Sequence, residues 1–264
     1  MIATEFEYAA QIVTACPVCG TNNPSTRRHD RDGFAIGTST CACGLGYLNP
    51  RLSAEQYTAF YQGPYRTLTT AFCGRRHDDP GAQRAAVRRA HTHAAAIAAR
   101  CDRHPTRLLD VGGGIGLMAR TMGLVLDMPS VTVLDASAED IRRAVGCRGI
   151  VGAVETLPPS TETYDLIVCL QTADHWRDPL AALRWMRQAC APGGHLWIDI
   201  VDIAAFQRTF PRACPWKVDH PLAWTEPAFQ RALTDTGWRV RDVVPQPRLA
   251  APSGYRPAFW CEGA

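Results

Sequence analysis

The sequence predicts an α/β fold, with an open, doubly wound sheet of parallel strands behind a small amino-terminal module. Two observations predict the sheet. An apolar run ends in closely spaced glycines at residues 108–116, and a β-branched run follows at residues 131–135. Strands that alternate with helical patterns are typical of parallel sheets. A third observation, two cysteine pairs within residues 16–43, predicts the module.

The cysteine pairs predict a structural zinc site with the ligands Cys16, Cys19, Cys41 and Cys43, and a glycine follows each pair. Four thiolates form the closed, tetrahedral ligand set of structural zinc. The second pair is one residue shorter than usual, so His29 remains an alternative ligand. Reduced free thiols, or a redox role for the first pair, are further alternatives. The segment has few apolar residues, and we expect it to need the metal in order to fold.

The residues after the cysteines predict two helices. Ser53 followed by an acidic first turn marks the start of the first helix, and Tyr61 and Tyr65 beyond it are candidates to close a pocket. Residues 82–101, rich in alanine and arginine, predict a longer helix. We expect His93 in this helix to face solvent.

Asp110 and the glycines at 112, 114 and 116 mark the place where the first strand of the sheet meets a ligand. Glycine lacks the Cβ that would keep a ligand away from the backbone, and it adopts positive φ at little cost. Ligands of open α/β sheets bind at the carboxyl ends of the strands. The dinucleotide fingerprint requires a third glycine at the sixth position from Gly112, and Leu117 stands there, so that fingerprint fails.

Asp135 ends the next strand, about twenty residues after the glycine turn, where a nucleotide cofactor offers its two ribose hydroxyls. A carboxylate accepts hydrogen bonds from both hydroxyls. Because a dehydrogenase uses the same device, Asp135 by itself leaves the identity of the cofactor open.

Four motifs follow one another in a fixed order. They are acid-x-Gly-x-Gly-x-Gly at 110–116, Gly-Ala-Val-Glu-Thr-Leu-Pro at 152–158, Gln-Thr-Ala-Asp-His-Trp-Arg-Asp-Pro at 171–179, and Ala-Pro-Gly-Gly at 191–194. The third follows a buried apolar strand at 164–170, and the fourth stands between a helix at 180–190 and a strand at 195–200. Together they resemble the motifs of class I S-adenosylmethionine-dependent methyltransferases. The resemblance implies a Rossmann-like sheet of seven strands, the last two within 238–264.

The resemblance also implies S-adenosyl-L-methionine as cofactor and S-adenosyl-L-homocysteine as product. The residues that it places around the cofactor are Asp110, Gly112, Gly114, Gly116, Asp135, Ala136, Ala153, Val154, Gln171 and Thr172. One position departs from the family. Where the family often has an acid that binds the adenine amine, this chain has Ala153. Backbone groups of Ala153 and Val154, or another side chain, would then hold the adenine.

The front of the chain resembles the zinc-containing front end of a methyltransferase subgroup. The residues that carry this likeness are the cysteine pairs, Cys-Gly-Leu-Gly-Tyr-Leu-Asn-Pro-Arg at 43–51 and Phe-Tyr-x-x-x-Tyr-Arg at 60–66. The subgroup includes sugar C-methyltransferases of antibiotic biosynthesis and other small-molecule enzymes. The likeness implies a zinc-binding substrate lid over residues 1–70 and a cofactor-binding core over 71–264.

Two histidines are candidates for the base of a methyl transfer, because the pKa of histidine lies near neutrality. His175 follows the fourth strand at the ligand-binding edge of the sheet and is the first candidate, with Asp174 to orient it. His220 is the second, in a segment that resembles the family loop over the substrate. Each histidine has a competing interpretation as a residue that only packs or shapes the pocket.

Composition limits the partners that we expect. The net charge of +3 on 264 residues is too small to indicate nucleic-acid binding. No apolar stretch approaches the roughly 18 residues of a membrane span. Residues 1–15 carry two glutamates and no basic cluster, unlike a secretory signal. We therefore expect a cytoplasmic protein with reduced cysteines and neither a membrane nor a nucleic-acid partner.

The sequence thus predicts C- or O-methylation of a small molecule, in secondary-metabolite or deoxysugar biosynthesis. The rivals are an RNA or protein methyltransferase that uses the zinc module for recognition, and a non-methylating protein on the same fold. The acceptor and the oligomeric state stay open.

Overall fold

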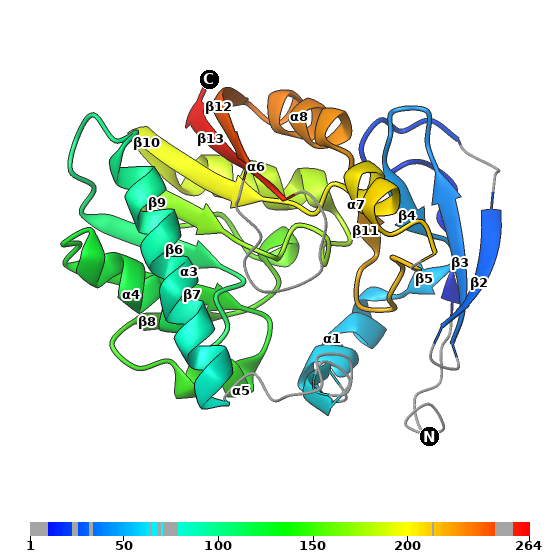
Figure 1. The fold of residues 1–264 in the computed structure, drawn as a ribbon, viewed down its shortest axis with the longest axis horizontal. Helices are drawn as coiled ribbons and strands as arrows, with labels where there is room; N and C mark the ends of the chain where they lie inside the picture. Colours follow the sequence, from blue (N-terminus) through cyan, green and yellow to red (C-terminus); the bar gives the residue numbers. More distant parts are fainter. Residues whose placement is uncertain are drawn as a thin grey trace.

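The core of the protein is a seven-stranded sheet, described by a computed structural model (Figure 1). The structure describes residues 10–22, 26–31, 34–63, 65–67, 70, 79–212, 214–245 and 256–264.

The strand order of the seven-stranded sheet is β12-β13-β10-β9-β6-β7-β8. The bounds are β6 (Arg107–Val111), β7 (Ser130–Asp135), β8 (Arg148–Val151), β9 (Tyr164–Cys169), β10 (Cys190–Asp199), β12 (Trp238–Pro245) and β13 (Pro257–Gly263). β13 runs antiparallel to both of its neighbours, whereas the strands from β10 to β8 are parallel. The predicted seven-stranded, doubly wound sheet is confirmed.

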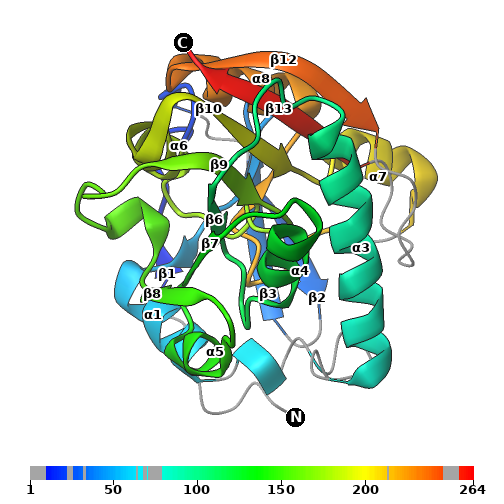
Figure 2. The same ribbon diagram turned by 90° about the vertical axis from the view of Figure 1, so that its left-hand side faces the viewer.

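Both faces of the central strands are buried. Leu108 and Trp197 pack into one hydrophobic cluster, and Leu109 and Ile198, their neighbours in sequence, pack into another. Alternate residues of a strand point to opposite faces, so a continuous apolar run requires a cover on each side. One cover consists of α3 (Pro80–Ala98), α4 (Leu117–Val125) and α5 (Ala138–Arg143), and the other contains α6 (Pro179–Ala189) and α8 (Glu226–Asp235) (Figures 1 and 2).

Local sequence signals set where the helices begin. The helix start predicted at Ser53 is confirmed: Ser53 caps α1 (Ala54–Gln62), and the structure adds a complete capping box with Gln56. Asp79 caps α3, Asp178 caps α6 and Thr225 caps α8, and each of these helices has proline in its first two positions. A short α7 (Ile203–Thr209) starts at the Asp202 cap. Among the described residues, none of the helices has the length and apolar character needed to cross a membrane.

The front module is built on a four-stranded sheet of order β11-β4-β3-β2 and a two-stranded pair β1-β5. The bounds are β1 (Ala10–Gln11), β2 (Thr26–Arg31), β3 (Phe34–Thr40), β4 (Gly46–Leu48), β5 (Arg51–Leu52) and β11 (Leu222–Ala223). β11 comes from the carboxyl-terminal half of the chain and pairs with β4. Tyr47 of the module lies in the same hydrophobic cluster as Trp224 and Phe229. The division at residue 70 stays a prediction, but the module shares a strand and a core with residues beyond it.

Two local expectations differ from the structure. His93 was expected to face solvent, but it is 2% exposed, and Trp197 Nε1 donates a hydrogen bond to His93 Nδ1 over 3.0 Å. His93 lies on the face of α3 that packs on the sheet, and the indole satisfies its ring nitrogen. The second difference is in β10, which already begins at Cys190 and includes the expected turn at 191–194 as an irregularity in its pairing with β9.

Candidate active site

The glycine turn lies at the end of β6. Gly112, Gly114 and Gly116 have φ angles of 76°, 55° and 73°, in the left-handed region that favours glycine. Gly112 also lacks room for a side chain, since a Cβ there would lie 2.3 Å from Thr172 Oγ1 in the loop after β9. A Cβ on Gly114 would meet no atom closer than Arg66 Nη2 at 3.7 Å. The turn is therefore packed against its neighbour at Gly112 and open at Gly114.

The two predicted carboxylates occupy different positions. Asp135, at the end of β7, accepts a hydrogen bond from Gly114 N–H at Oδ2 and one from Ser137 N–H at Oδ1, each over 2.8 Å. Asp110 is 4% exposed and lies beneath the turn, where its carboxylate would be 2.5 Å from a Cβ on Gly113. Burial, with a smaller contribution from Asp135, raises the pKa of Asp110 from 3.8 to about 7.

The raised pKa of Asp110 predicts a pH-dependent stability. In the unfolded chain the carboxyl loses its proton near pH 3.8, and in the folded protein near pH 7. The free energy of unfolding therefore falls as the pH rises between these values, by at most roughly 1.4 kcal/mol per unit. Asp110→Asn should remove this slope, so that the variant gains stability relative to wild type from pH 4 to pH 7. Denaturant unfolding at each pH measures the difference, with the exposed Asp102→Asn as control. A constant difference across the range would contradict the burial effect.

A cavity of about 780 Å³ joins the glycine turn to the front module, a volume within the range of about 300–1,000 Å³ common for small-molecule sites. Eight of the ten residues that the resemblance placed around the cofactor line it: Gly112, Gly114, Asp135, Ala136, Ala153, Val154, Gln171 and Thr172. Asp110 and Gly116 are outside the lining. Gly116 instead begins α4 as its N-cap residue. Tyr61, Tyr65 and His175 line the same cavity.

An acid absent from the predicted site, Glu155, lines the wall beside Ala153. Its Oε1 accepts a hydrogen bond from Arg177 N–H over 3.1 Å, and burial raises its pKa. Glu155 is part of the 152–158 motif, so the sequence carried the signal for it. Glu155 thus gives the cavity a carboxylate close to Ala153, the position at which the sequence resemblance led us to expect an acid for the adenine amine.

The front module reaches across the glycine turn to the core. Arg66 forms an ion pair with the buried Asp140 of α5, and Gln62 Nε2 donates to the Ala136 carbonyl over 3.4 Å. Tyr61 and Tyr65 contact each other edge to face, with ring centroids 4.8 Å apart. The sequence held no signal for the Arg66–Asp140 pair, because the two residues are distant along the chain.

His175 lies in the loop between β9 and α6, with its ring against those of the two tyrosines. The Tyr61 hydroxyl lies 2.9 Å from His175 Nδ1. Asp174, the expected orienting partner, is farther away, with its Oδ1 3.9 Å from His175 Nε2. The tyrosine is therefore the closer partner of His175, a contact that the sequence did not predict.

His220 is outside the cavity lining and packs against His175, with ring centroids 4.5 Å apart. Its Nδ1 lies 3.1 Å from Asp174 Oδ2, and its Nε2 lies 3.6 Å from Asp219 Oδ2. Burial by itself would raise the pKa of Asp174, but the neighbouring His220 and His175 lower it below its usual value. Burial lowers the pKa of His220, against the opposing effect of Asp174 and Asp219. Both base candidates thus share one carboxylate, and only His175 meets the cavity.

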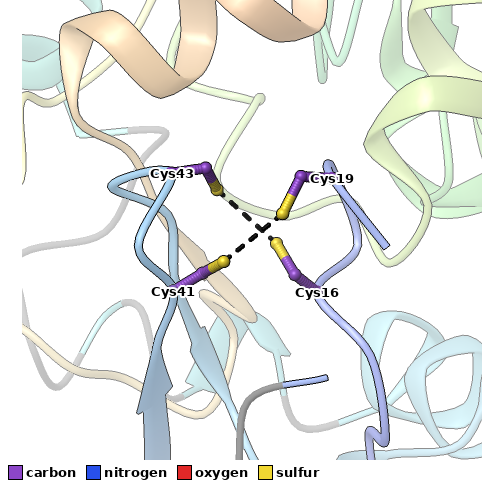
Figure 3. Close-up of side chains that lie close together, drawn as sticks. All are labelled: Cys16, Cys19, Cys41 and Cys43. Atoms are coloured by element: carbon purple, nitrogen blue, oxygen red, sulfur yellow. Dashed lines mark hydrogen bonds between the residues drawn. The ribbon is translucent and has the colours of Figure 1, made fainter. Parts of the chain in front are cut away.

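The four predicted zinc ligands converge on one point (Figure 3). All four Sγ atoms lie within 4.8 Å of one another, with Cys16 and Cys43 3.7 Å apart and Cys19 and Cys41 3.4 Å apart. Zinc–sulfur bonds of about 2.3 Å in a tetrahedron place the sulfurs about 3.8 Å apart, so the cluster fits zinc. The short second pair is accommodated by the turn in which Gly44 N–H donates to the Cys41 carbonyl over 2.9 Å. The side chain of His29, the alternative ligand, lies outside the described residues.

Comparison with known proteins connects this geometry to one family. The profile of a family described as a methyltransferase domain matches residues 79–243. The chloroplastic 2-methyl-6-phytyl-1,4-hydroquinone methyltransferase 1 of Oryza sativa subsp. japonica is 34% identical over 99 residues, which are 34% of this chain and 29% of the relative. The ubiquinone biosynthesis O-methyltransferase of Xanthomonas oryzae pv. oryzae (strain PXO99A) is 28% identical over 113 residues, 40% of this chain and 47% of the relative. The chain therefore spans less than half the length of these curated relatives.

Solved structures agree on the fold. The magnesium protoporphyrin IX methyltransferase of Synechocystis PCC 6803, with bound SAH, superposes with a TM-score of 0.59 at 11% identity, covering 80% of this chain and all of that one. A SAM-dependent methyltransferase of Leishmania major gives a TM-score of 0.57 at 18% identity, covering 79% and 82%. The family profile covers more than half of the chain. The chain therefore belongs to the methyltransferase-domain family and has the class I fold of the S-adenosylmethionine-dependent methyltransferases.

Proposed function

We propose that this protein transfers a methyl group from S-adenosylmethionine to a small-molecule acceptor. The shared cavity carries the proposal, because its lining includes the glycine turn and Asp135 as well as His175 and two tyrosines. A cofactor at the turn and an acceptor beside His175 would meet in one cavity, as alignment for methyl transfer requires. The family of the matched profile supports the same chemistry.

The residues present fit the cofactor. Besides its two backbone hydrogen bonds, each oxygen of Asp135 keeps a lone pair for a ribose hydroxyl. The open backbone at Gly114 suits the carboxypropyl-amine end of the cofactor, with Gln171 and Thr172 beside it. The wall at 153–155 would hold the adenine, and Glu155 offers a carboxylate there. Asp110 and Gly116 would support the turn from behind.

The bound cofactor would supply a methyl group on a sulfonium sulfur. The chain would align the acceptor and remove its proton as the bond to the methyl carbon forms. The tautomer of His175 with its proton on Nδ1 donates to the Tyr61 oxygen and leaves Nε2 as the proton acceptor. The Asp174 carboxylate, 3.9 Å from Nε2, would then stabilise the imidazolium. His220 would act behind His175, through the carboxylate that the two histidines share.

Replacing His175 with alanine should lower turnover by about a hundredfold, because a positioned base contributes about 10²–10⁴-fold. Affinity for the cofactor should stay close to that of wild type, since the turn is untouched. Steady-state kinetics and calorimetry measure the two quantities. The exposed His104→Ala is the matched control. Unchanged turnover in the His175 variant would exclude it as the base.

The acceptor class needs a direct assay. We propose a carbon or oxygen nucleophile on a small molecule of secondary metabolism, such as a deoxysugar, since the cavity is of small-molecule size. Incubating the protein with trideuteromethyl-labelled cofactor and a panel of sugars, phenols, quinols, tRNA and proteins tests this proposal by mass spectrometry. A small molecule that gains one labelled methyl group in place of a hydrogen supports it. Label only in tRNA or protein, or in nothing, would overturn it.

We also propose that Cys16, Cys19, Cys41 and Cys43 hold a structural zinc ion. The support is the sulfur separation of 3.7 Å between Cys16 and Cys43 and of 3.4 Å between Cys19 and Cys41, together with the convergence of all four Sγ atoms within 4.8 Å of one another. A full set of four sulfur ligands leaves no open position for catalysis. Reduced thiols of this kind suit a cytoplasmic setting, which we propose as well.

A further inference from the structure

The strongest unassigned feature is a second group of metal-ligating side chains, beside the cavity and separate from the four cysteines. Asp174, His175 and His220 each offer one ligand atom, and these atoms all lie within 4.8 Å of one another. We propose that these three side chains form a binding site for a divalent transition-metal ion, and that filling this site blocks the base of the methyl transfer.

The spacing of the three groups suits one ion. Asp174 Oδ2 is 3.1 Å from His220 Nδ1, and Asp174 Oδ1 is 3.9 Å from His175 Nε2. Bonds of about 2.0–2.2 Å to nitrogen and oxygen place neighbouring ligand atoms about 3–3.5 Å apart. The carboxylate thus presents one oxygen to each imidazole, and a small rotation of His175 would bring its Nε2 within reach of the ion.

The outer nitrogen of each histidine faces an oxygen atom of a neighbouring side chain. A metal-bound imidazole commonly donates its other N–H to an oxygen, which fixes the tautomer and the ring plane. With Nε2 of His175 toward the ion, Nδ1 lies 2.9 Å from the Tyr61 hydroxyl. With Nδ1 of His220 toward the ion, Nε2 lies 3.6 Å from Asp219 Oδ2. Asp219 is 3% exposed, and its Oδ1 has no hydrogen-bond partner among the described residues. This buried carboxylate would act as the supporting acceptor of such a site.

The scaffold holds the two contributing loops together before any ion binds. Leu222 N–H donates to the Asp174 carbonyl over 3.2 Å, and Trp224 Nε1 donates to the Ala173 carbonyl over 2.8 Å. The loop that carries His220 is therefore tied to the loop that carries the other two ligands. Preorganisation of this kind lowers the cost of assembling a site.

The ligand set selects the class of ion. Two imidazoles and one carboxylate suit Zn²⁺, Co²⁺, Ni²⁺ and Fe²⁺ rather than Mg²⁺ or Ca²⁺, which prefer oxygen ligands. The ion would coordinate Nε2 of His175. In the proposed methyl transfer, the same lone pair on Nε2 takes the proton from the small molecule that is methylated. This inhibitory consequence rests on the proposed function, whereas ion binding does not.

Ion binding can be tested on the untagged chain of 264 residues after its cysteines have been loaded with zinc. Titration with Co²⁺, followed by calorimetry and visible absorption, should show one further ion per chain without release of zinc. Asp219→Asn should weaken the binding by about ten- to a hundredfold, and His220→Ala by at least as much. The exposed His104→Ala should bind like wild type. Thermal melts establish that the variants are folded, and Asp219→Asn is nearly isosteric. The site would be refuted if no further ion binds, or if neither variant changes its affinity.

Inhibition has its own readout. Methyl transfer by the wild-type protein should fall as Co²⁺ is added, with a midpoint at the measured Kd, and should recover when the ion is dialysed away. Asp219→Asn should shift the midpoint by the factor found for binding. Turnover that rises, or does not respond while the site fills, would overturn the inhibitory role. A third outcome separates the two proposals. If the ion binds as expected but the ion-free protein methylates none of the acceptors, the proposed function is refuted and the metal site stands.

Discussion

Replacing Gly112 with alanine is expected to weaken the binding of S-adenosylmethionine by about a thousandfold, which corresponds to about 4 kcal/mol. Two costs add up. A φ of 76° costs a residue with a Cβ about 1–2 kcal/mol. The new methyl group would also lie 2.3 Å from Thr172 Oγ1, an overlap of the kind that costs about 1–3 kcal/mol.

Thr172 has little freedom to move away from the new methyl group. Gln171, the residue before it, has a positive φ of 57°, and its N–H donates to Asp199 Oδ1 over 2.6 Å. The Thr172 hydroxyl donates to the Leu170 carbonyl over 3.1 Å. We therefore expect the glycine turn, rather than the loop after β9, to shift, and the turn is the proposed contact with the cofactor.

Calorimetric titration of the cofactor into the Gly112→Ala variant measures this effect. Gly146→Ala is the matched control, because Gly146 has nearly the same φ, 75°, and lies outside the cavity lining. Its Cβ would meet only the flexible Arg120 side chain at 3.0 Å. The control should keep cofactor affinity within about tenfold of wild type. Wild-type affinity in Gly112→Ala would show that the cofactor binds elsewhere.

Replacing Cys41 with serine is expected to release the metal and lower the Tm by about 10 °C or more. Structural zinc contributes several kcal/mol or more to folding, and each kcal/mol shifts the Tm of a chain of this size by about 2–4 °C. The damage should spread, because Cys41 is 4% exposed and lies in the same hydrophobic cluster as Trp224 and Phe229. The turn at Gly44 also touches the core directly, where the Thr225 hydroxyl donates to the Gly44 carbonyl over 3.1 Å.

Metal analysis and thermal melts test the zinc prediction. Wild type should contain one zinc ion per chain and the Cys41→Ser variant none. Cys101→Ser is the matched control, since Cys101 is a half-buried thiol outside the cluster. The control should melt close to wild type. Metal-free wild-type protein with an unchanged Tm would contradict a structural zinc ion.

Much of the fold was predictable because its signals are local. The apolar runs at 108–111 and 164–170 bury both of their faces, so they could be assigned to a covered parallel sheet without tertiary information. Glycines at positions of positive φ marked the turn after β6. Cysteine spacing predicted a cluster that the structure assembles. The boundary of β10 was missed because a Pro-Gly-Gly sequence usually ends a strand, whereas here it is absorbed as an irregularity in the pairing.

Contacts between elements, both at the site and in the core, could not be predicted in the same way. The Tyr61 hydroxyl meets His175, Arg66 meets Asp140, and His93 meets Trp197, and the members of each pair are far apart in sequence. No spacing rule connects such partners, since their contact depends on how whole elements pack.

The sequence by itself determined the sheet, the glycine turn, the cysteine cluster and the choice of His175 and His220, because each depends on backbone conformation, side-chain periodicity or a short motif. Only the tertiary structure decided which histidine meets the cavity, and that Asp174 lies closer to His220 than to His175. The physical reason is that hydrogen bonds and ion pairs depend on distances of a few ångströms between elements. The packing of the loop that ends at β11 against the loop between β9 and α6 sets those distances.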